Sequence, residues 1–184
     1  MSEEKVLTKE IAERYLGGKY SIPLYHFNVA EDYVLESLSK HKYSLNLSGL
    51  RSLSDAAAES LSNHHGATLY LDGLTELSDT AAQSLSKHQR TLFLNGLMKL
   101  TDSGAESLSK HQGEGLALAG LTELSDAAAE SLGKYQGGYI AFDNLTALSD
   151  SAAGSLGNYD GELLGLDNIP ESAAQILRDA GHGE

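Results

Sequence analysis

The sequence of 184 residues contains no cysteine and no tryptophan, and only two prolines. Without cysteine, the chain can form no disulfide, no thiolate metal site and no cysteine nucleophile. Lys and Arg number 13 against 26 Asp and Glu, which gives a formal net charge of -13 at pH 7. This charge repels phosphate groups and anionic lipids, so neither nucleic acid nor a membrane is expected as a partner.

Long hydrophobic runs are also missing. The N-terminal residues 1–16 are charged throughout and lack the apolar segment of a signal peptide, and no later run approaches the roughly 20 apolar residues of a membrane span. We therefore expect a cytoplasmic protein, with export by a signal-independent route left open. The length fits one domain or one short repeat array.

What the sequence does contain is a repeat of 23 or 24 residues, marked by pairs of apolar residues spaced two apart. The pairs are Ile22/Leu24, Leu45/Leu47, Leu69/Leu71, Leu92/Leu94, Leu116/Leu118, Ile140/Phe142 and Leu164/Leu166. Such alternation predicts one short strand in each repeat, hence seven strands, with the paired side chains buried.

The remainder of each repeat has one recurring order of residues. A glycine or asparagine after the strand, such as Gly73 or Asn144, suits a turn. Ser-Asp or Thr-Asp then opens a helix, since the hydroxyl residue is suited to cap its N-terminus. Small residues and a leucine, such as Ala81, Ala82 and Leu85, would face inward from that helix. Stacked units of this kind form a parallel sheet, a row of helices and a leucine core between them.

Residues 69–85, LYLDGLTELSDTAAQSL, resemble a leucine-rich repeat, in particular the cysteine-containing type and the related bacterial GALA-type variant. The resemblance covers residues 21–169. It implies an α/β leucine-rich-repeat solenoid, a right-handed coil with strands on the concave side and helices on the convex side. It also implies a tendency to bind proteins, and it supplies no catalytic residues. Leu74 and its equivalents stand where these repeats usually have Asn or Cys, so we expect no asparagine ladder.

The two ends of the chain differ from the repeats. Residues 1–20 contain an apolar helical face and are interpreted as an N-terminal capping helix. Residues 170–184 begin with a proline, which suits a first helical turn, and are interpreted as a C-terminal capping helix. Together with the solenoid 21–169 they are predicted to form one structural domain.

Each repeat holds a serine, an aspartate and a histidine or tyrosine, but this set cannot act as a catalytic triad. Asp79 begins its helix and His88 follows nine residues later, which places them about 13 Å apart at 1.5 Å per residue. A base and its orienting acid must lie within about 3 Å of each other. We therefore predict no enzymatic activity and no catalytic residues.

Stacking of the repeats predicts a column of rings. Its members are His41, His64, His88, His111, Tyr135 and Tyr159. Histidines in a column could bind a metal ion, but tyrosine replaces histidine in the last two coils and no carboxylate is consistently adjacent. A structural role is favoured, and we predict no metal and no cofactor. Charged histidines in a column repel one another, so stability should fall toward about pH 5.

The concave face is the predicted binding site, because the repeats differ there. Tyr70 and Phe93 are neighbouring aromatics beside a shallow hollow predicted at Gly115, Ala117 and Ala119. Aromatic anchors supply much of the energy of interfaces; cross-strand packing that shields the sheet is the alternative. The predicted partner-binding residues are Asn46, Tyr70, Asp72, Phe93, Asn95, Tyr139 and Asp143.

The sequence thus favours a non-catalytic protein-protein interaction module whose partner carries some basic surface. The alternative is a structural scaffold that assembles with itself, for example as a homodimer. Asp143 and Asp167 are neighbours in one column and could hold a cation. As two carboxylates directly before Asn144 and Asn168, they suit turns better.

Overall fold

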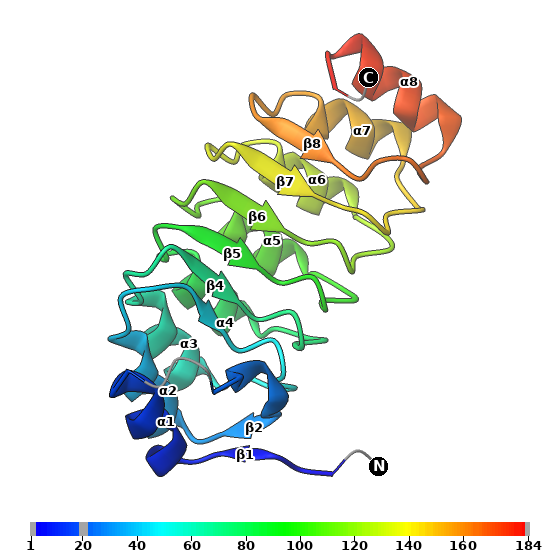
Figure 1. Cartoon of the computed structure of the whole chain (residues 1–184). Coiled ribbons are helices and arrows are strands. Elements are labelled where there is room, and N and C mark those ends of the chain that lie inside the picture. The colour runs from blue at the N-terminus through cyan, green and yellow to red at the C-terminus, as the bar shows by residue number, and fades with distance from the viewer. Residues whose placement is uncertain (1–2, 19–21, 183–184) are drawn as a thin grey trace.

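A computed structural model describes residues 3–18 and 22–182, and within them strands and helices alternate along an elongated stack (Figure 1). The strands are β1 (Val6–Leu7), β2 (Val29–Ala30), β3 (Leu45–Asn46), β4 (Thr68–Tyr70), β5 (Thr91–Phe93), β6 (Gly115–Ala117), β7 (Tyr139–Ala141) and β8 (Glu162–Leu164). The helices are α1 (Lys9–Leu16), α2 (Asp32–Ser39), α3 (Asp55–Ser62), α4 (Asp79–Leu85), α5 (Asp102–Leu108), α6 (Asp126–Leu132), α7 (Asp150–Leu156) and α8 (Glu171–Asp179), and a 3-10 helix, η1, covers Leu24–His26.

Strands β3 to β8 form one parallel sheet in chain order. Residues one repeat apart are direct neighbours in it, as Leu69 is to Leu92 and Leu92 is to Leu116. The arrows lie along one side of the stack and the helices along the other (Figure 1). The chain is therefore an α/β leucine-rich-repeat solenoid, as the repeat predicts.

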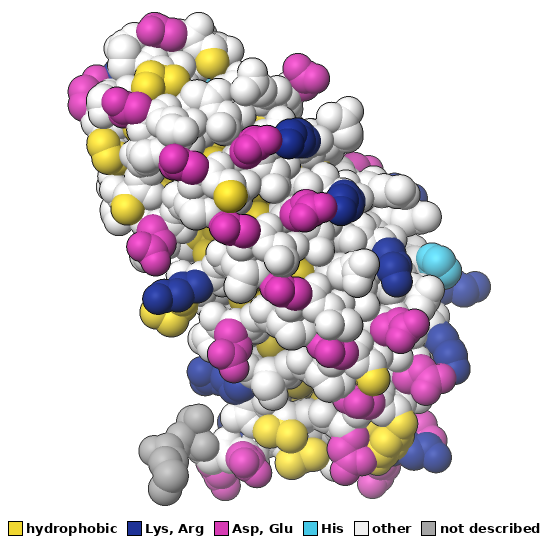
Figure 2. Space-filling view, turned by 180° about the vertical axis from the view of Figure 1, so that it is seen from behind, with side chains coloured by type: hydrophobic (Ala, Val, Ile, Leu, Met, Phe, Trp, Pro, Cys, Tyr) yellow, Lys and Arg dark blue, Asp and Glu magenta, His cyan; other side chains and the backbone are white. Residues whose placement is uncertain are grey.

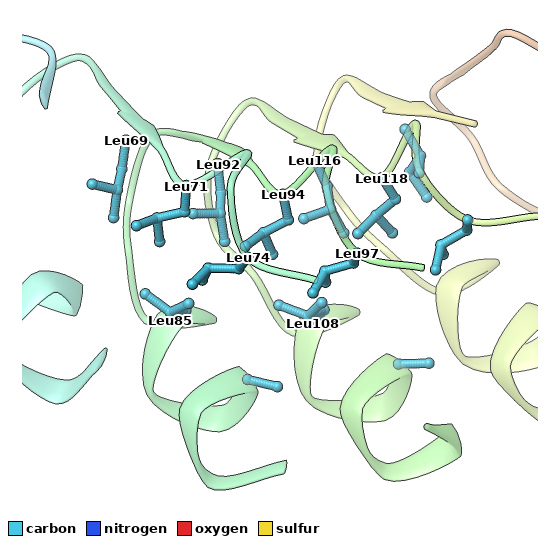
Figure 3. Packing of buried hydrophobic residues seen from close by; sticks show 14 of the residues in the cluster. Leu69, Leu71, Leu74, Leu85, Leu92, Leu94, Leu97, Leu108, Leu116 and Leu118 are labelled. Carbon is cyan, nitrogen blue, oxygen red and sulfur yellow. The ribbon is translucent and has the colours of Figure 1, made fainter. Parts of the chain in front are cut away.

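The core is a ladder of leucines between the sheet and the helices (Figure 3). In one coil, Leu69, Leu71, Leu74 and Leu85 are fully buried. The next coil repeats the set with Leu92, Leu94, Leu97 and Leu108. Burial of each such side chain stabilises the fold by about 1.5–3 kcal/mol. The buried small residues of α3 to α7 allow these helices to approach the ladder closely.

The hydroxyl residue that caps each of the helices α3 to α7 also joins that helix to the preceding one, which the sequence analysis did not predict. Ser78 Oγ accepts the N–H of Ala81 at 3.0 Å and donates to Asp55 Oδ1 of the previous coil at 2.5 Å. Equivalent bonds of 2.5 or 2.6 Å recur from the Ser54–Asp32 pair to the Ser149–Asp126 pair. The repeated Ser-Asp or Thr-Asp pair therefore starts one helix and links it to its neighbour.

The predicted first strand is wrong. Ile22 lies outside any strand and Leu24 begins η1, so the main sheet has six strands in the described residues instead of seven. Pro23 between them has no backbone N–H to donate to a ladder, which disfavours a strand at this position.

The predicted register of the last strand is shifted by one residue. Leu163 pairs with Ile140 and is buried, whereas Leu164 pairs with Ala141 and lies on the concave face. Because Leu163 and Leu164 are adjacent, either of them could fill the buried strand position in the repeat pattern. Gly165, at φ 73°, then turns the chain out of the strand, a backbone conformation that glycine adopts readily.

The ends of the stack carry α1 and α8, which pack against α2 and α7 respectively. Leu7, in the short strand β1 before α1, is buried, and β1 pairs with β2 apart from the main sheet. The N-terminal segment is thus half a coil, with a helix but no strand in the main sheet. The predicted boundary between residues 20 and 21 lies outside the described residues, and the division into caps and solenoid stays a prediction.

Candidate functional site

Tyr70, Phe93 and Tyr139 form an aromatic group on the concave face. Tyr70 and Phe93 are cross-strand neighbours whose stacked rings have centroids 4.7 Å apart and planes inclined by 28°. Tyr139 starts β7 beside Gly115 of β6, and a Cβ at Gly115 would lie 2.1 Å from the Tyr139 ring. The missing side chain of Gly115 therefore makes room for the Tyr139 ring to lie over β6.

This arrangement alters the hollow that the sequence predicted. Tyr139 occupies the part over Gly115, and Ala117 and Ala119 are buried at 3% and 9% exposure. Tyr70 and Phe93 are half-buried rather than fully exposed. The aromatic group thus shields the sheet and also presents ring surface to solvent. We call Tyr70, Phe93 and Tyr139 the aromatic platform, because no hollow lies beside them at Gly115.

Asp72 and Asn95 use their side chains to hold neighbouring coils together. Asp72 Oδ2 accepts a hydrogen bond from Ser48 Oγ at 2.9 Å, and its Oδ1 accepts the N–H of Asn95 at 3.1 Å. Asn95 Oδ1 in turn accepts the N–H of Ala119 at 3.1 Å. A short polar ladder therefore exists directly after the strands. We expected no asparagine ladder at the Leu74 position, and the observed polar ladder lies two residues before that position.

Asn46 and Asp143 are the exposed polar candidates on this face. Asn46 is the cross-strand neighbour of Tyr70, and its Oδ1 accepts the N–H of Ser48 at 3.1 Å. Asp143 follows β7, and its Oδ1 would lie 2.2 Å from a Cβ at Gly165. The predicted site residues therefore fall into three groups, namely the aromatic platform, the polar ladder that follows the strands and two exposed polar side chains.

The ring column is present at the ends of the helices except for its predicted first member, His41. The His41 ring is inclined by 59° and 63° to the rings of Tyr15 and Tyr43, with centroids 5.0 and 5.5 Å away. His64, His88, His111, Tyr135 and Tyr159 stack in this order, with centroids 5.7–6.2 Å apart and planes within 17–20° of parallel. His182 continues the column, with its centroid 6.5 Å from that of Tyr159. His182 was not predicted, although it stands 23 residues after Tyr159 and the repeat spacing could have indicated it.

At the tyrosine end, the column bonds to the backbone of the preceding coil. Tyr135 and Tyr159 donate their hydroxyl hydrogens to the carbonyl oxygens of Gly113 and Gly137, at 2.7 and 2.8 Å. Burial raises the pKa of both hydroxyls, that of Tyr159 to about 12. Both tyrosines therefore remain protonated donors at neutral pH.

His88 is the exception in the column. His64 Nε2 and His111 Nε2 lie 2.9 Å from carbonyl oxygens of their preceding coils. His88 is fully buried, and neither of its ring nitrogens makes a hydrogen bond of standard geometry, although a weaker interaction with the His64 backbone favours its charged form. Burial, and secondarily the nearby His64 and His111, lower the pKa of His88 to about 4. His88 is therefore uncharged at neutral pH, and burial lowers the pKa of His64 and His111 in the same direction.

No cluster of three or more His, Cys, Asp or Glu suited to a metal ion occurs in residues 3–18 and 22–182. His64 and His111 direct their Nε2 atoms toward backbone carbonyls, and the two aspartates of the predicted cation site lie in turns. Among the described helices, none is both long and apolar enough to cross a membrane.

The stacked coils, the inward leucines and the open face of the parallel sheet define a repeat solenoid of the leucine-rich-repeat kind. Neither a protein-family model nor a curated protein matches the sequence. A solved structure that matches is an internalin (inlF) from Listeria monocytogenes str. 4b F2365, with 17% sequence identity and a TM-score of 0.45. The match covers 82% of this chain and 49% of the internalin chain, so this chain spans about half the length of the internalin. The cysteine-containing and GALA types gain no support from it, and this chain has no cysteine.

Proposed function

We propose that this protein is a non-catalytic protein-protein interaction module that binds a partner through the concave face of its sheet. The supporting observation is that aromatic rings occupy positions where the fold does not need them. The column that holds Tyr70 and Phe93 holds alanine at Ala117 and Ala141 in later coils, with the same strand pairing. The rings are therefore not required to form a coil, and binding gives them a role.

The stacking of Tyr70 on Phe93 also favours binding. Two rings already fixed against each other lose little conformational freedom when a partner covers them, and preorganised aromatic side chains are common among the residues that dominate interface energies. Exposed Asn46 and Asp143 supply polar groups at the margins of the platform. The net charge of -13 favours a partner with basic surface, because opposite charges speed encounter and suppress wrong partners.

The candidate catalytic side chains have other roles in the coil, which supports the non-catalytic proposal. Ser78 and Asp55 join two helices, and His88 lies buried in the ring column. Asp79 at the start of α4 accepts a hydrogen bond from Thr101 of the next coil. A cytoplasmic location and the bacterial GALA-like repeat type remain proposals from the sequence.

A pull-down from the native source with the double variant Tyr70→Ala/Phe93→Ala tests the proposed face. We expect at least about a tenfold loss of the captured partner, since truncating one central aromatic anchor costs about 2 kcal/mol or more. The melting temperature should fall by only a few degrees, because alanine is the residue that other coils use in this column.

The matched control is Tyr33→Ala, an aromatic that is 50% exposed on α2, away from the sheet. It should leave capture unchanged. Equal capture by the double variant and the unmodified protein would show that the face is wrong. The alternative function, self-assembly, is tested by light scattering across protein concentrations. A protein that stays strictly monomeric at high concentration would exclude this alternative.

A further inference from the structure

β8 is the last strand of the sheet, and within the described chain its outer side is unpaired. Glu162 donates its N–H to the Gly138 carbonyl at 2.8 Å, and the Leu164 carbonyl accepts from Phe142 N–H at 2.9 Å. Both residues thus bond toward β7. Because successive residues of a strand direct their backbone groups to opposite sides, the N–H and C=O of Leu163 point away from β7. Such an edge can template a further strand.

This edge borders an open cleft of about 1000 Å³ between the last coil and α8. α8 lies beside α7, on the helix side of the stack, and β8 remains the outermost arrow of the sheet (Figure 1). Leu166 and Ile169 contribute apolar surface to the cleft, whereas Leu163 and Leu177 line it as buried side chains. The cleft exists because the chain passes from β8 to α8 without forming another strand.

The N-terminal end of the sheet is covered differently. The carbonyl oxygens of Tyr25 and Phe27 each lie 2.3 Å from where a Cβ of Gly49 would stand. Residues around η1 therefore pack closely against the first complete coil.

The border of the cleft is acidic. Asp160, Glu162, Asp167 and Glu171 line it, and the basic lining residue Arg178 is paired with Glu171. Residues 135–184 hold eight of the 26 acidic side chains and one of the 13 basic ones. Figure 2 shows mainly Asp and Glu at this end, on the side seen from behind. Two copies of such an edge would repel each other, whereas a basic segment would be attracted.

We propose that the β8 edge and its cleft bind an extended segment of a partner protein that adds as a strand parallel to β8. Backbone bonds to Leu163 hold the segment, and its alternate apolar side chains cover the partly exposed Leu166 and Ile169. Lysine or arginine residues flanking the segment face Asp160 and Glu162. Backbone pairing supplies affinity in this mode of recognition, and the side chains supply specificity.

The test uses the full chain and a fluorescein-labelled peptide, Lys-Lys-Val-Thr-Leu-Thr-Lys-Lys, in a fluorescence anisotropy titration. The comparison peptide, Glu-Glu-Val-Thr-Leu-Thr-Glu-Glu, has the same apolar residues and opposite charge. We expect the lysine peptide to bind at least about tenfold more tightly. Failure of the lysine peptide to bind, or equal binding of both peptides, overturns the proposal.

Charge reversal locates the binding site. The variant Asp160→Lys/Glu162→Lys should weaken the lysine peptide about tenfold, since both carboxylates are exposed and neither contributes its side chain to the core. The control Glu59→Lys/Glu76→Lys makes the same charge change at exposed positions elsewhere and should have little effect. Equal weakening by both variants would mean attraction to net charge alone and would contradict a site at β8.

Amide hydrogen exchange at Leu163 tests strand addition itself. The Leu163 N–H should exchange at least about tenfold more slowly once the lysine peptide is bound, because a partner carbonyl then accepts from it. Binding without that protection rules out the strand. Protection that rises with protein concentration in the absence of peptide would identify a second copy of the chain as the occupant, contrary to the proposal. The Tyr70→Ala/Phe93→Ala variant should bind the peptide normally, which separates this site from the concave face.

Discussion

Lowering the pH from 7.5 to 5 should destabilise the protein by about 2 kcal/mol through His88 alone, by proton linkage. His88 has a folded-state pKa of about 4 against a reference value of 6.5. The unfolded chain therefore takes up its proton first as the pH falls. The stability contributed by neutral His88 is fully present above about pH 6.5 and is lost progressively as the pH falls toward the folded-state pKa.

The surroundings of His88 explain the magnitude of this effect. The ring is fully buried between the rings of His64 and His111, with centroids 5.7 and 6.2 Å away, and neither ring nitrogen makes a hydrogen bond of standard geometry. A charge placed there has lost its water, and a second charge on a neighbouring histidine would repel it. Burial lowers the pKa of His41, His64 and His111 as well, so their contributions have the same sign.

The assay is urea unfolding followed by circular dichroism at both pH values, for the unmodified protein and for His88→Phe. Phenylalanine keeps a flat ring in the column and removes the titration, so the variant should lose about 2 kcal/mol less between pH 7.5 and 5. Carboxylates that titrate in the same range affect both proteins and cancel in the comparison. An identical loss in His88→Phe and the unmodified protein would refute the reasoning.

Three further predictions concern stability, each measured by urea unfolding at neutral pH. Leu94→Ala should destabilise by about 2–5 kcal/mol, because it opens a cavity in the fully buried leucine ladder, and a loss under about 1 kcal/mol would contradict that packing. Ser78→Ala should cost about 1–2 kcal/mol through the lost cap and interhelical bond, whereas Ser78→Thr, the residue of an equivalent coil, should cost less. Gly154→Ala should stabilise α7 by up to about 1 kcal/mol, since a Cβ there meets nothing within 4 Å. Gly137→Ala should instead destabilise, since its Cβ would lie 2.1 Å from the Tyr135 hydroxyl, and the reverse order of these two glycine variants would be inconsistent with the structure.

The interior of the coils could be predicted from the sequence because every coil imposes the same constraints. The positions of Leu69, Leu71 and Leu85 recur with the same spacing, and all three are fully buried. The errors lie at the ends, where one flanking coil is missing. Pro23 disfavours the strand expected around it, and two adjacent leucines left the last register undecided until pairing with Ile140 selected Leu163.

The candidate site was predictable only in part, because its geometry depends on contacts between coils. The sequence indicated that Tyr70 and Phe93 are neighbours, and they stack. Tyr139 lying over Gly115 and the bond from Asn95 N–H to Asp72 depend on distances that a repeat pattern does not contain. The same holds for the hydroxyl-to-aspartate bonds between helices, since the pattern shows both residues but not that they belong to different coils.

Photo-crosslinking tests the central claim, that the concave face binds a protein partner, most directly. A benzophenone amino acid placed at Phe93 is compared with one at Thr80, an exposed position on α4 on the opposite side of the coil. Covalent capture of one partner from position 93, and none from position 80, is the predicted result. Capture from position 80 alone, or equally from both positions, would contradict binding through the sheet.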